Sequence, residues 1–284
     1  MWLLLLFVHV FALTGFNLIL RKSLLNNLDK FTLATIMQTG IAVPMLALVI
    51  FSPPNFSKYD SIDFFNLAIV ILLTIGLHIT HVKALQYLEA GVFSIIYNLR
   101  MVIATILGIV FLNEDIVWLR ILGGLLILVA IVIVRQKSSQ SIRVKGVEWG
   151  IIAAFTIAFL NLSEKIMINS VGVLNYFPFA MLVAAAIMWL YLFYRKEKID
   201  KALFIQPRMI QLMMLRAVSA YGFTFALATG ALVSVGSYIS GMSVILMVVM
   251  GALLLNERDY LMRKAIATAI AVGGLTIILL SNLL

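Results

Sequence analysis

The chain has 284 residues, of which 63% are hydrophobic and only 12% charged, and its formal net charge is +9. Soluble domains are nearer half apolar and a quarter charged, so this chain has too few polar residues to coat a water-soluble fold. The Lys and Arg residues lie in short clusters between apolar runs, as at the flanks of membrane helices, which excludes a nucleic-acid-binding face. Without cysteine, the chain has no disulfide, no thiolate metal site and no cysteine nucleophile.

Ten apolar segments are long enough to cross the hydrocarbon core of a bilayer as an α-helix, which takes about 20 residues. They are continuously apolar, without the alternation of barrel strands, so we predict an all-α integral membrane protein. The first segment lacks a basic n-region and a cleavage site, and we expect it to be a retained helix rather than a signal peptide. The predicted helices are Trp2–Leu20, Phe31–Phe51, Phe64–Leu88, Val92–Leu112, Val117–Val134, Val147–Ile168, Tyr176–Tyr194, Met209–Gly230, Leu232–Leu255 and Tyr260–Asn282.

A short motif recurs at about half the chain length. The sequence Leu-Asn-Glu at residues 112–114 returns at residues 255–257, an offset of 143 residues. We therefore predict two repeats of five helices each, residues 1–137 and residues 145–284. Because five is an odd number, the second repeat enters the membrane upside down. This inverted arrangement is common in secondary transporters that work by alternating access.

The same residues carry a resemblance to a known family. Residues 84–90 (Ala-Leu-Gln-Tyr-Leu-Glu-Ala), the helix that ends in the 112–114 motif, and the pair Gly123-Gly124 resemble the EamA type of the drug/metabolite transporter superfamily. The pattern from Gly15 to Arg21 is similar to that family too. The resemblance implies ten helices around a central cavity, two halves that rock about it, and amino acids, sugars, nucleotide conjugates, organic acids or amines as substrates. Two positions depart from the family's usual prolines in the fourth and ninth helices: Met101 and Val244.

Charged side chains deep in a membrane helix cost several kcal/mol, about 3 on insertion scales, and need a partner or a wet cavity. Arg100 lies deep in the fourth predicted helix, one turn after Tyr97, and is the main candidate for gripping a substrate carboxylate or phosphate. The alternative is a structural arginine bonded to backbone carbonyls. His78 and His81 share one helix face, for substrate hydrogen bonding or proton relay, or as packed histidines.

Further polar residues are predicted to line the same cavity, each with local packing or snorkelling as the alternative. Asn17 and Asn161 hold equivalent places in the two repeats, while Lys83 and Arg216 lie nearer helix ends. The two histidines have no third metal ligand nearby in the sequence, so we predict no metal site. No cluster of catalytic side chains is evident either, and we predict no cofactor and no catalytic site. The predicted substrate-binding residues are Arg100, His78, His81, Tyr97, Asn17, Asn161, Arg216, Lys83, Tyr221, Tyr238 and Ser240.

Every acidic residue is expected in a loop or near a helix end, with Glu164 the deepest, and Glu257 is expected to be solvated or paired with Arg263. The basic centre favours a secondary transporter of a small polar metabolite, an organic anion or a zwitterion such as an amino acid. An exporter of amines or aromatic cations and an integral membrane enzyme remain the alternatives. Proton coupling is expected to be absent, as in a facilitator or an exchanger, or else to use His78 or His81. The expected partners are a small-molecule substrate and the lipid bilayer, and a homodimer is left open.

The distribution of Lys and Arg predicts the topology. Of the 21 Lys and Arg residues, three are set aside as intramembrane, and 15 of the other 18 fall on the side opposite the termini. The positive-inside rule then places a multi-pass protein in the cell membrane with both termini outside, whereas the family resemblance implies both inside. On intact cells, a Ser138→Cys variant of this cysteine-free chain should stay unlabelled by an impermeant maleimide. Labelling would contradict the charge count.

Overall fold

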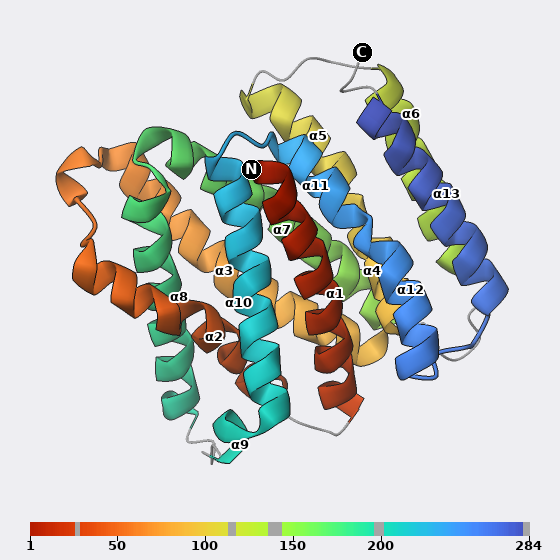
Figure 1. The fold of residues 1–284 in the computed structure, drawn as a ribbon, viewed down its shortest axis with the longest axis horizontal. Coiled ribbons are helices and arrows are strands. Elements are labelled where there is room, and N and C mark those ends of the chain that lie inside the picture. The colour runs from red at the N-terminus through yellow and green to blue at the C-terminus, as the bar shows by residue number, and fades with distance from the viewer. Residues whose placement is uncertain (26–28, 113–117, 136–143, 196–201, 281–284) are drawn as a thin grey trace.

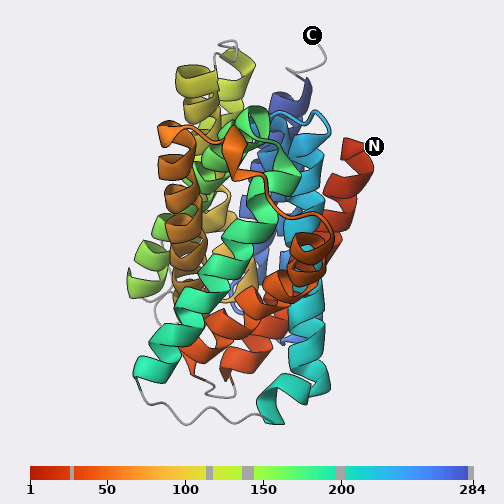
Figure 2. The ribbon, with the colours of Figure 1, turned by 90° about the vertical axis from the view of Figure 1, so that its left-hand side faces the viewer.

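The computed structural model describes residues 1–25, 29–112, 118–135, 144–195 and 202–280. Within these ranges every regular element is a helix, and the helices form one bundle (Figures 1 and 2). Most of the predicted boundary between the repeats, together with Glu114 and Ser138, lies outside the described residues. The helices are α1 (Trp2–Leu25), α2 (Lys30–Phe51), η1 (Phe56–Lys58), α3 (Ser61–Tyr87), α4 (Ala90–Tyr97), α5 (Leu99–Leu112), α6 (Trp118–Arg135), α7 (Val144–Ser170), α8 (Val173–Tyr194), α9 (Ala202–Ile205), α10 (Pro207–Ala228), α11 (Val233–Gly241), α12 (Ser243–Leu254) and α13 (Leu261–Leu280).

Eight helical stretches of the described chain are long and apolar enough to cross a membrane. Six are single helices, and the other two are the pairs α4 with α5 and α11 with α12. Many large apolar side chains point outward, such as Leu72 and Leu190, which are 67% and 66% exposed. A surface of this kind is suited to lipid rather than water. The protein is therefore an all-α, multi-pass membrane protein.

The helices α6 and α13 occupy the places of the fifth and tenth predicted helices and pack against each other. They have 18 and 20 residues. An 18-residue helix is about 27 Å long, close to the thickness of the hydrocarbon core. That all ten segments span the membrane stays a prediction.

Local sequence signals start several of these helices. Asp29 accepts a hydrogen bond from the backbone N–H of Thr32 at 2.7 Å and so caps α2. Asp60 and Asp63 form a capping box at the start of α3, each bonding the backbone N–H of the other. Pro207 opens α10, a position where its missing N–H costs no helical bond.

The fourth and ninth predicted helices are each interrupted near the middle, although neither carries a proline there. The interruptions lie at Asn98 and Met242, between α4 and α5 and between α11 and α12. They face each other: α4 packs on α12, α5 packs on α11, and the Asn98 side-chain amide approaches the Gly241 carbonyl at 3.5 Å. A Cβ on Gly241 would lie only 1.8 Å from the end of the Met101 side chain. Glycine at this interruption therefore gives Met101 its room.

The first half of the chain (α1–α6) packs on the second half (α7–α13) in a reciprocal way. The helix α3 packs along α7, as α10 packs along α1. In the same way α2 packs against α8, and α6 packs against α13. The start of α1 and the end of α13 lie at the same end of the bundle, which we call the terminal end (Figures 1 and 2).

The repeated Leu-Asn-Glu motif has a structural explanation in its second copy. Asn256 adopts a left-handed conformation, with φ of 55°, which asparagine tolerates better than most residues. The N–H of the following Glu257 then bonds back to the Gly251 carbonyl at 3.2 Å and closes α12. The motif is thus a helix stop that directs the glutamate side chain. Its first copy extends beyond the described residues.

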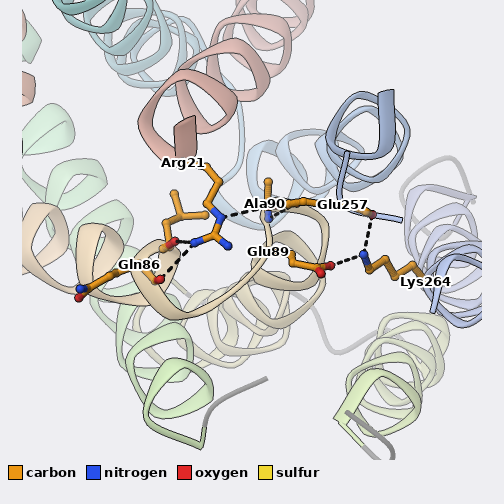
Figure 3. Close-up of polar contacts among 7 residues, drawn as sticks. Arg21, Gln86, Glu89, Ala90, Glu257 and Lys264 are labelled. Atoms are coloured by element: carbon orange, nitrogen blue, oxygen red, sulfur yellow. Dashed lines mark hydrogen bonds and ion pairs between the residues drawn. The ribbon is translucent and has the colours of Figure 1, made fainter. Parts of the chain in front are cut away.

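At the end of the bundle opposite the terminal end, Glu257 joins the two halves (Figure 3). Arg21 donates from Nε to the Glu257 carboxylate at 3.0 Å, and the N–H of Ala90 donates to the same carboxylate at 2.8 Å. The expectation that Glu257 would be solvated or paired with Arg263 is therefore wrong, because the left-handed turn at Asn256 directs it inward. Burial raises the pKa of Glu257, although Arg21 opposes the shift.

Four further contacts complete this closure network, which we define as Arg21, Glu89, Ala90, Glu257 and Lys264 (Figure 3). Arg21 also donates to the last carbonyls of α3, and Lys264 forms an ion pair with Glu89 and donates to the Glu257 carbonyl. All of these groups belong to the ends of α1, α3 and α12 or the starts of α4 and α13. The network therefore ties the halves together at one end of the bundle.

The close packing of α6 on α13 depends on one glycine of a pair. A Cβ on Gly274 would lie 2.5 Å from the Gly123 carbonyl oxygen, whereas one on Gly273 would meet nothing within 4 Å. We expect Gly274→Ala to lower the thermal unfolding midpoint in detergent, with a cost of about 1–3 kcal/mol for forced separation of the helices. Gly273→Ala is the matched control and should leave the midpoint unchanged or slightly raised. Equal midpoints for the two variants would contradict this packing.

Candidate functional site

A cavity lies at the centre of the bundle, lined by α1–α5 of the first half and by α7, α8, α10 and α11 of the second. Its free volume is about 60 Å³, room for only a few water molecules. Pockets that hold metabolites typically measure about 300–1,000 Å³. In this state the cavity is therefore too small to hold a typical metabolite.

Arg100 is the second residue of α5, directly after the interruption, and its side chain reaches the cavity although it is only 4% exposed. Its guanidinium lies 4.3 Å from the centre of the Tyr97 ring and donates from Nη2 to the Ser240 hydroxyl at 2.8 Å. Its buried Nε has no hydrogen-bond partner among the described residues. Part of the donor capacity of this buried cation is therefore left for a ligand.

The Ser240 hydroxyl, which accepts a hydrogen bond from Arg100, is itself held by His9 of α1. The ring of His9 lies 2.7 Å from the Ser219 carbonyl through Nδ1 and 2.7 Å from the Ser240 hydroxyl through Nε2. A carbonyl only accepts, so Nδ1 carries the proton and Nε2 accepts from Ser240. The result is a one-way chain of donors from Arg100 through Ser240 and His9 to Ser219. Such chains strengthen each bond by polarisation and fix the direction of the guanidinium.

Two further charged groups, Arg216 of α10 and Glu164 of α7, line the cavity. Glu164 is 5% exposed and accepts a hydrogen bond from Thr224 at 3.3 Å. The guanidinium of Arg216 lies 5.6 Å from the centre of the Phe16 ring. With Arg100, the cavity thus holds two guanidinium groups and one carboxylate.

The depth of Glu164 corrects the expectation that every acidic residue lies in a loop or near a helix end. The next residue, Lys165, reaches outward to the Leu227 and Ala231 carbonyls at 3.0 and 3.4 Å. Successive residues on a helix point about 100° apart, so Glu164 turns to the cavity while Lys165 turns away. The centre of the protein is therefore not purely basic.

Comparison with known proteins bears on this arrangement. Residues 1–136 match the EamA-like transporter family. This family belongs to the drug/metabolite transporter superfamily, and the resemblance inferred from the sequence is confirmed. Comparison with curated proteins gives no match. Among 28 solved chains that match the fold, one crystal structure aligns over 98% of this chain and 96% of its own, with a TM-score of 0.68 and 16% identity. That likeness concerns the fold alone.

The EamA-like match makes a membrane transporter, rather than an enzyme, the class that the comparisons support. It covers the first half of the chain, which supplies Arg100 and His9 to the cavity. Arg216, Glu164 and Ser240 come from the second half. The polar centre is thus shared between the halves.

The structure brings together a little more than half of the predicted substrate-binding residues. Arg100 and Tyr97 reach the cavity from the first half, and Arg216 reaches it from the second. His81 is at the cavity too, and its Nε2 lies 2.6 Å from the side-chain oxygen of Asn17, which stands behind it. The predicted residues that line the cavity are Arg100, His81, Tyr97, Asn161, Arg216 and Ser240.

The other predicted residues make local contacts away from the cavity lining. His78 bonds to Gln38 at 2.7 Å, and the Tyr221 hydroxyl donates to the Ile41 carbonyl at 2.5 Å. The Tyr238 hydroxyl bonds to Thr105. Lys83 lies 4.0 Å from the centre of the Trp149 ring, where a cation–π contact holds it. In this structure these residues make packing and hydrogen-bond contacts outside the cavity lining, which was the alternative to a substrate-binding role.

Three residues that line the cavity or hold its side chains, His9, Ser219 and Thr224, were not predicted from the sequence. His9 lies in the most apolar part of the chain, and its signal was that of any ionisable side chain inside a membrane segment. Ser219 and Thr224 carry no such signal, because serine and threonine commonly bond to their own helix. Only the packing of α10 on α1 and α7 brings them to the cavity.

The hydrogen bonds predict different ring tautomers for two of the three histidines. His9 should carry its proton on Nδ1. His78 should carry it on Nε2, because Gln38 donates to the Met181 carbonyl at 2.8 Å and so turns its own carbonyl oxygen to His78. Ring ¹⁵N chemical shifts of histidine-labelled protein check this, with a His9→Gln variant to assign the signals. A His9 signal with the proton on Nε2 would contradict the donor chain.

Proposed function

We propose that the protein is a secondary transporter that moves a small polar metabolite bearing an anionic group through the central cavity. The observation that carries this proposal is the convergence of Arg100 and Arg216, from opposite halves, on one small cavity. Burying two guanidinium groups in a membrane protein is costly. A structural role would not need Arg100 to keep an unpartnered Nε beside a cavity.

Alternating access between two inverted repeats, residues 1–137 and 145–284, is the proposed mechanism. Supporting it are the recurrence at 143 residues and the exchange of equivalent partners, in which α3 packs on α7 as α10 packs on α1. A pseudo-two-fold axis between the halves produces such exchange. The small cavity and the closure network at one end support a state that must open before the ligand enters.

The charges of the cavity favour one class of ligand. Two guanidinium groups and one carboxylate leave one positive charge uncompensated, which suits an organic anion. A zwitterion suits it too, because its ammonium group pairs with Glu164 while its anionic group pairs with Arg100. A purely cationic amine is the less favourable occupant, since it must approach two fixed cations.

Glu164 also changes the proposal for energy coupling. Proton coupling through His78 has little support, because His78 bonds to Gln38 and does not line the cavity. Glu164 is a carboxylate inside the cavity, and within the described residues it accepts a hydrogen bond from the Thr224 hydroxyl and forms no ion pair. If protons drive transport, Glu164 is the group we expect to carry them, since a buried carboxylate gains by protonation.

The role of Arg100 is tested first by ligand screening. A thermal-shift screen of the purified chain against a panel of anions, zwitterions and cations identifies the ligand. We expect Arg100→Ala to stay folded and to bind that ligand at least about tenfold more weakly, since a charge-assisted bond contributes about 1.5–3 kcal/mol. Arg100→Lys should recover part of the loss, because an ammonium group cannot reproduce the planar fork.

The matched control for this test is Arg208→Ala, which removes an arginine at the start of α10, outside the cavity. It should leave the affinity unchanged. Stabilisation by cations alone, or full affinity in Arg100→Ala, would overturn the proposed ligand class and leave Arg100 a structural role.

A further inference from the structure

A second, larger hollow lies away from the central cavity, between α2, α3 and α8, which pack on one another (Figure 1). Its volume is about 600 Å³, ten times that of the central cavity and within the usual range for small-molecule sites. It lies where α2 begins and α8 ends, at the end of the bundle opposite the terminal end (Figure 2). We call it the flank cleft.

On both α3 and α8, the residues that line the flank cleft change in the same order along the helix, from apolar to cationic. On α3, Ile75 and Ile79 line it at successive turns and Lys83 follows one turn later. On α8, Ile187 and Met188 come first and Arg195 stands at the helix end. The cleft is therefore apolar toward the middle of the bundle and cationic toward its end.

The start of α2 completes the cationic rim. Lys30 contributes a third cation, and Asp29 is the one acid among the lining residues. The Asp29 carboxylate already accepts a hydrogen bond from the backbone N–H of Thr32 at 2.7 Å. Phe31 and Tyr191 bridge α2 and α8, with ring centres 4.5 Å apart. Among the described residues that line the cleft, three are cations, and the one carboxylate is already engaged as a helix cap.

The two lysines of the rim keep hydrogen-bond donors available. Lys83 lies over the Trp149 ring at 4.0 Å, and Lys30 lies 6.0 Å from the centre of the Tyr87 ring. Within the described residues, neither lysine forms an ion pair. A cation–π contact orients an ammonium group but leaves N–H donors for an anion.

We propose that the flank cleft binds an anionic phospholipid, with its phosphate at Lys30 and Lys83 and its acyl chains along the apolar walls. Basic pockets between membrane helices suit anionic headgroups. The occupant must be amphiphilic, because the apolar walls and the cationic rim are continuous. Exposure supports access from the bilayer: Ile187 and Tyr191 are 41% and 46% exposed on the outer side of α8. The proposal does not depend on the transported substrate.

Native mass spectrometry of the purified full chain tests it. Phosphatidylglycerol and phosphatidylcholine with identical acyl chains are titrated separately, and bound lipids are counted. We expect at least about fivefold tighter binding of phosphatidylglycerol, the factor for one cation near the membrane surface. Equal binding of the two lipids by the wild-type chain would overturn the proposal, whatever the variants do.

Two double variants locate the site. Lys30→Met with Lys83→Met should bring phosphatidylglycerol binding down to that of phosphatidylcholine. Lys22→Met with Lys145→Met removes two exposed cations from the same end of the bundle, outside the cleft, and should keep the preference. Equal loss in both double variants would overturn the assignment to the cleft. Complete displacement of the lipid by inorganic phosphate would show a site for the free anion and would overturn the lipid occupant.

Discussion

A guanidinium group inside a bilayer needs polar partners or water, and the centre of this protein is organised around that constraint. Arg100 meets it with Tyr97 and with the Ser240 hydroxyl, which His9 holds in place. Arg216 meets it by facing the same cavity, which also holds the Glu164 carboxylate. These side chains come from both halves of the chain, so the halves must stay together for each charge to keep its environment. The polar centre is thus both the candidate binding site and a reason why the halves associate.

The proposed alternating access requires the halves to separate at one end while the apolar contacts around this centre stay packed. At the end opposite the terminal end, the closure is polar: Arg21 and Glu257 join α1 to the loop after α12 at 3.0 Å. If these groups part, water replaces their partners and offsets some of the cost of breaking a largely buried ion pair. The interruptions at Asn98 and Met242 face each other, and three of the four helices that they separate (α4, α5 and α11) line the cavity.

The sequence predicts the membrane helices well because burial in lipid demands about 20 apolar residues in a row. It also predicts Arg100 and Arg216, since a cation in such a segment needs an explanation. The sequence is less informative where the position of a residue within one helical turn decides whether its side chain lines the cavity. His78 and His81 lie three residues apart, yet His81 lines the cavity and His78 packs on Gln38. The interruptions form without proline, and the inward turn of Glu257 depends on the backbone at Asn256, which no periodicity reveals.

The central claim is that the cavity opens to water on each side of the membrane in turn. The cysteine-free chain allows a direct measurement that needs no known substrate. A single cysteine in place of Ser237, which lines the cavity, is treated in proteoliposomes with a small charged methanethiosulfonate reagent from one side at a time. Ala180→Cys, fully buried in the core outside the cavity lining, is the control. The account predicts reaction of the Ser237→Cys variant from both sides and no reaction of the control. Reaction from one side only, or from neither, would contradict alternating access.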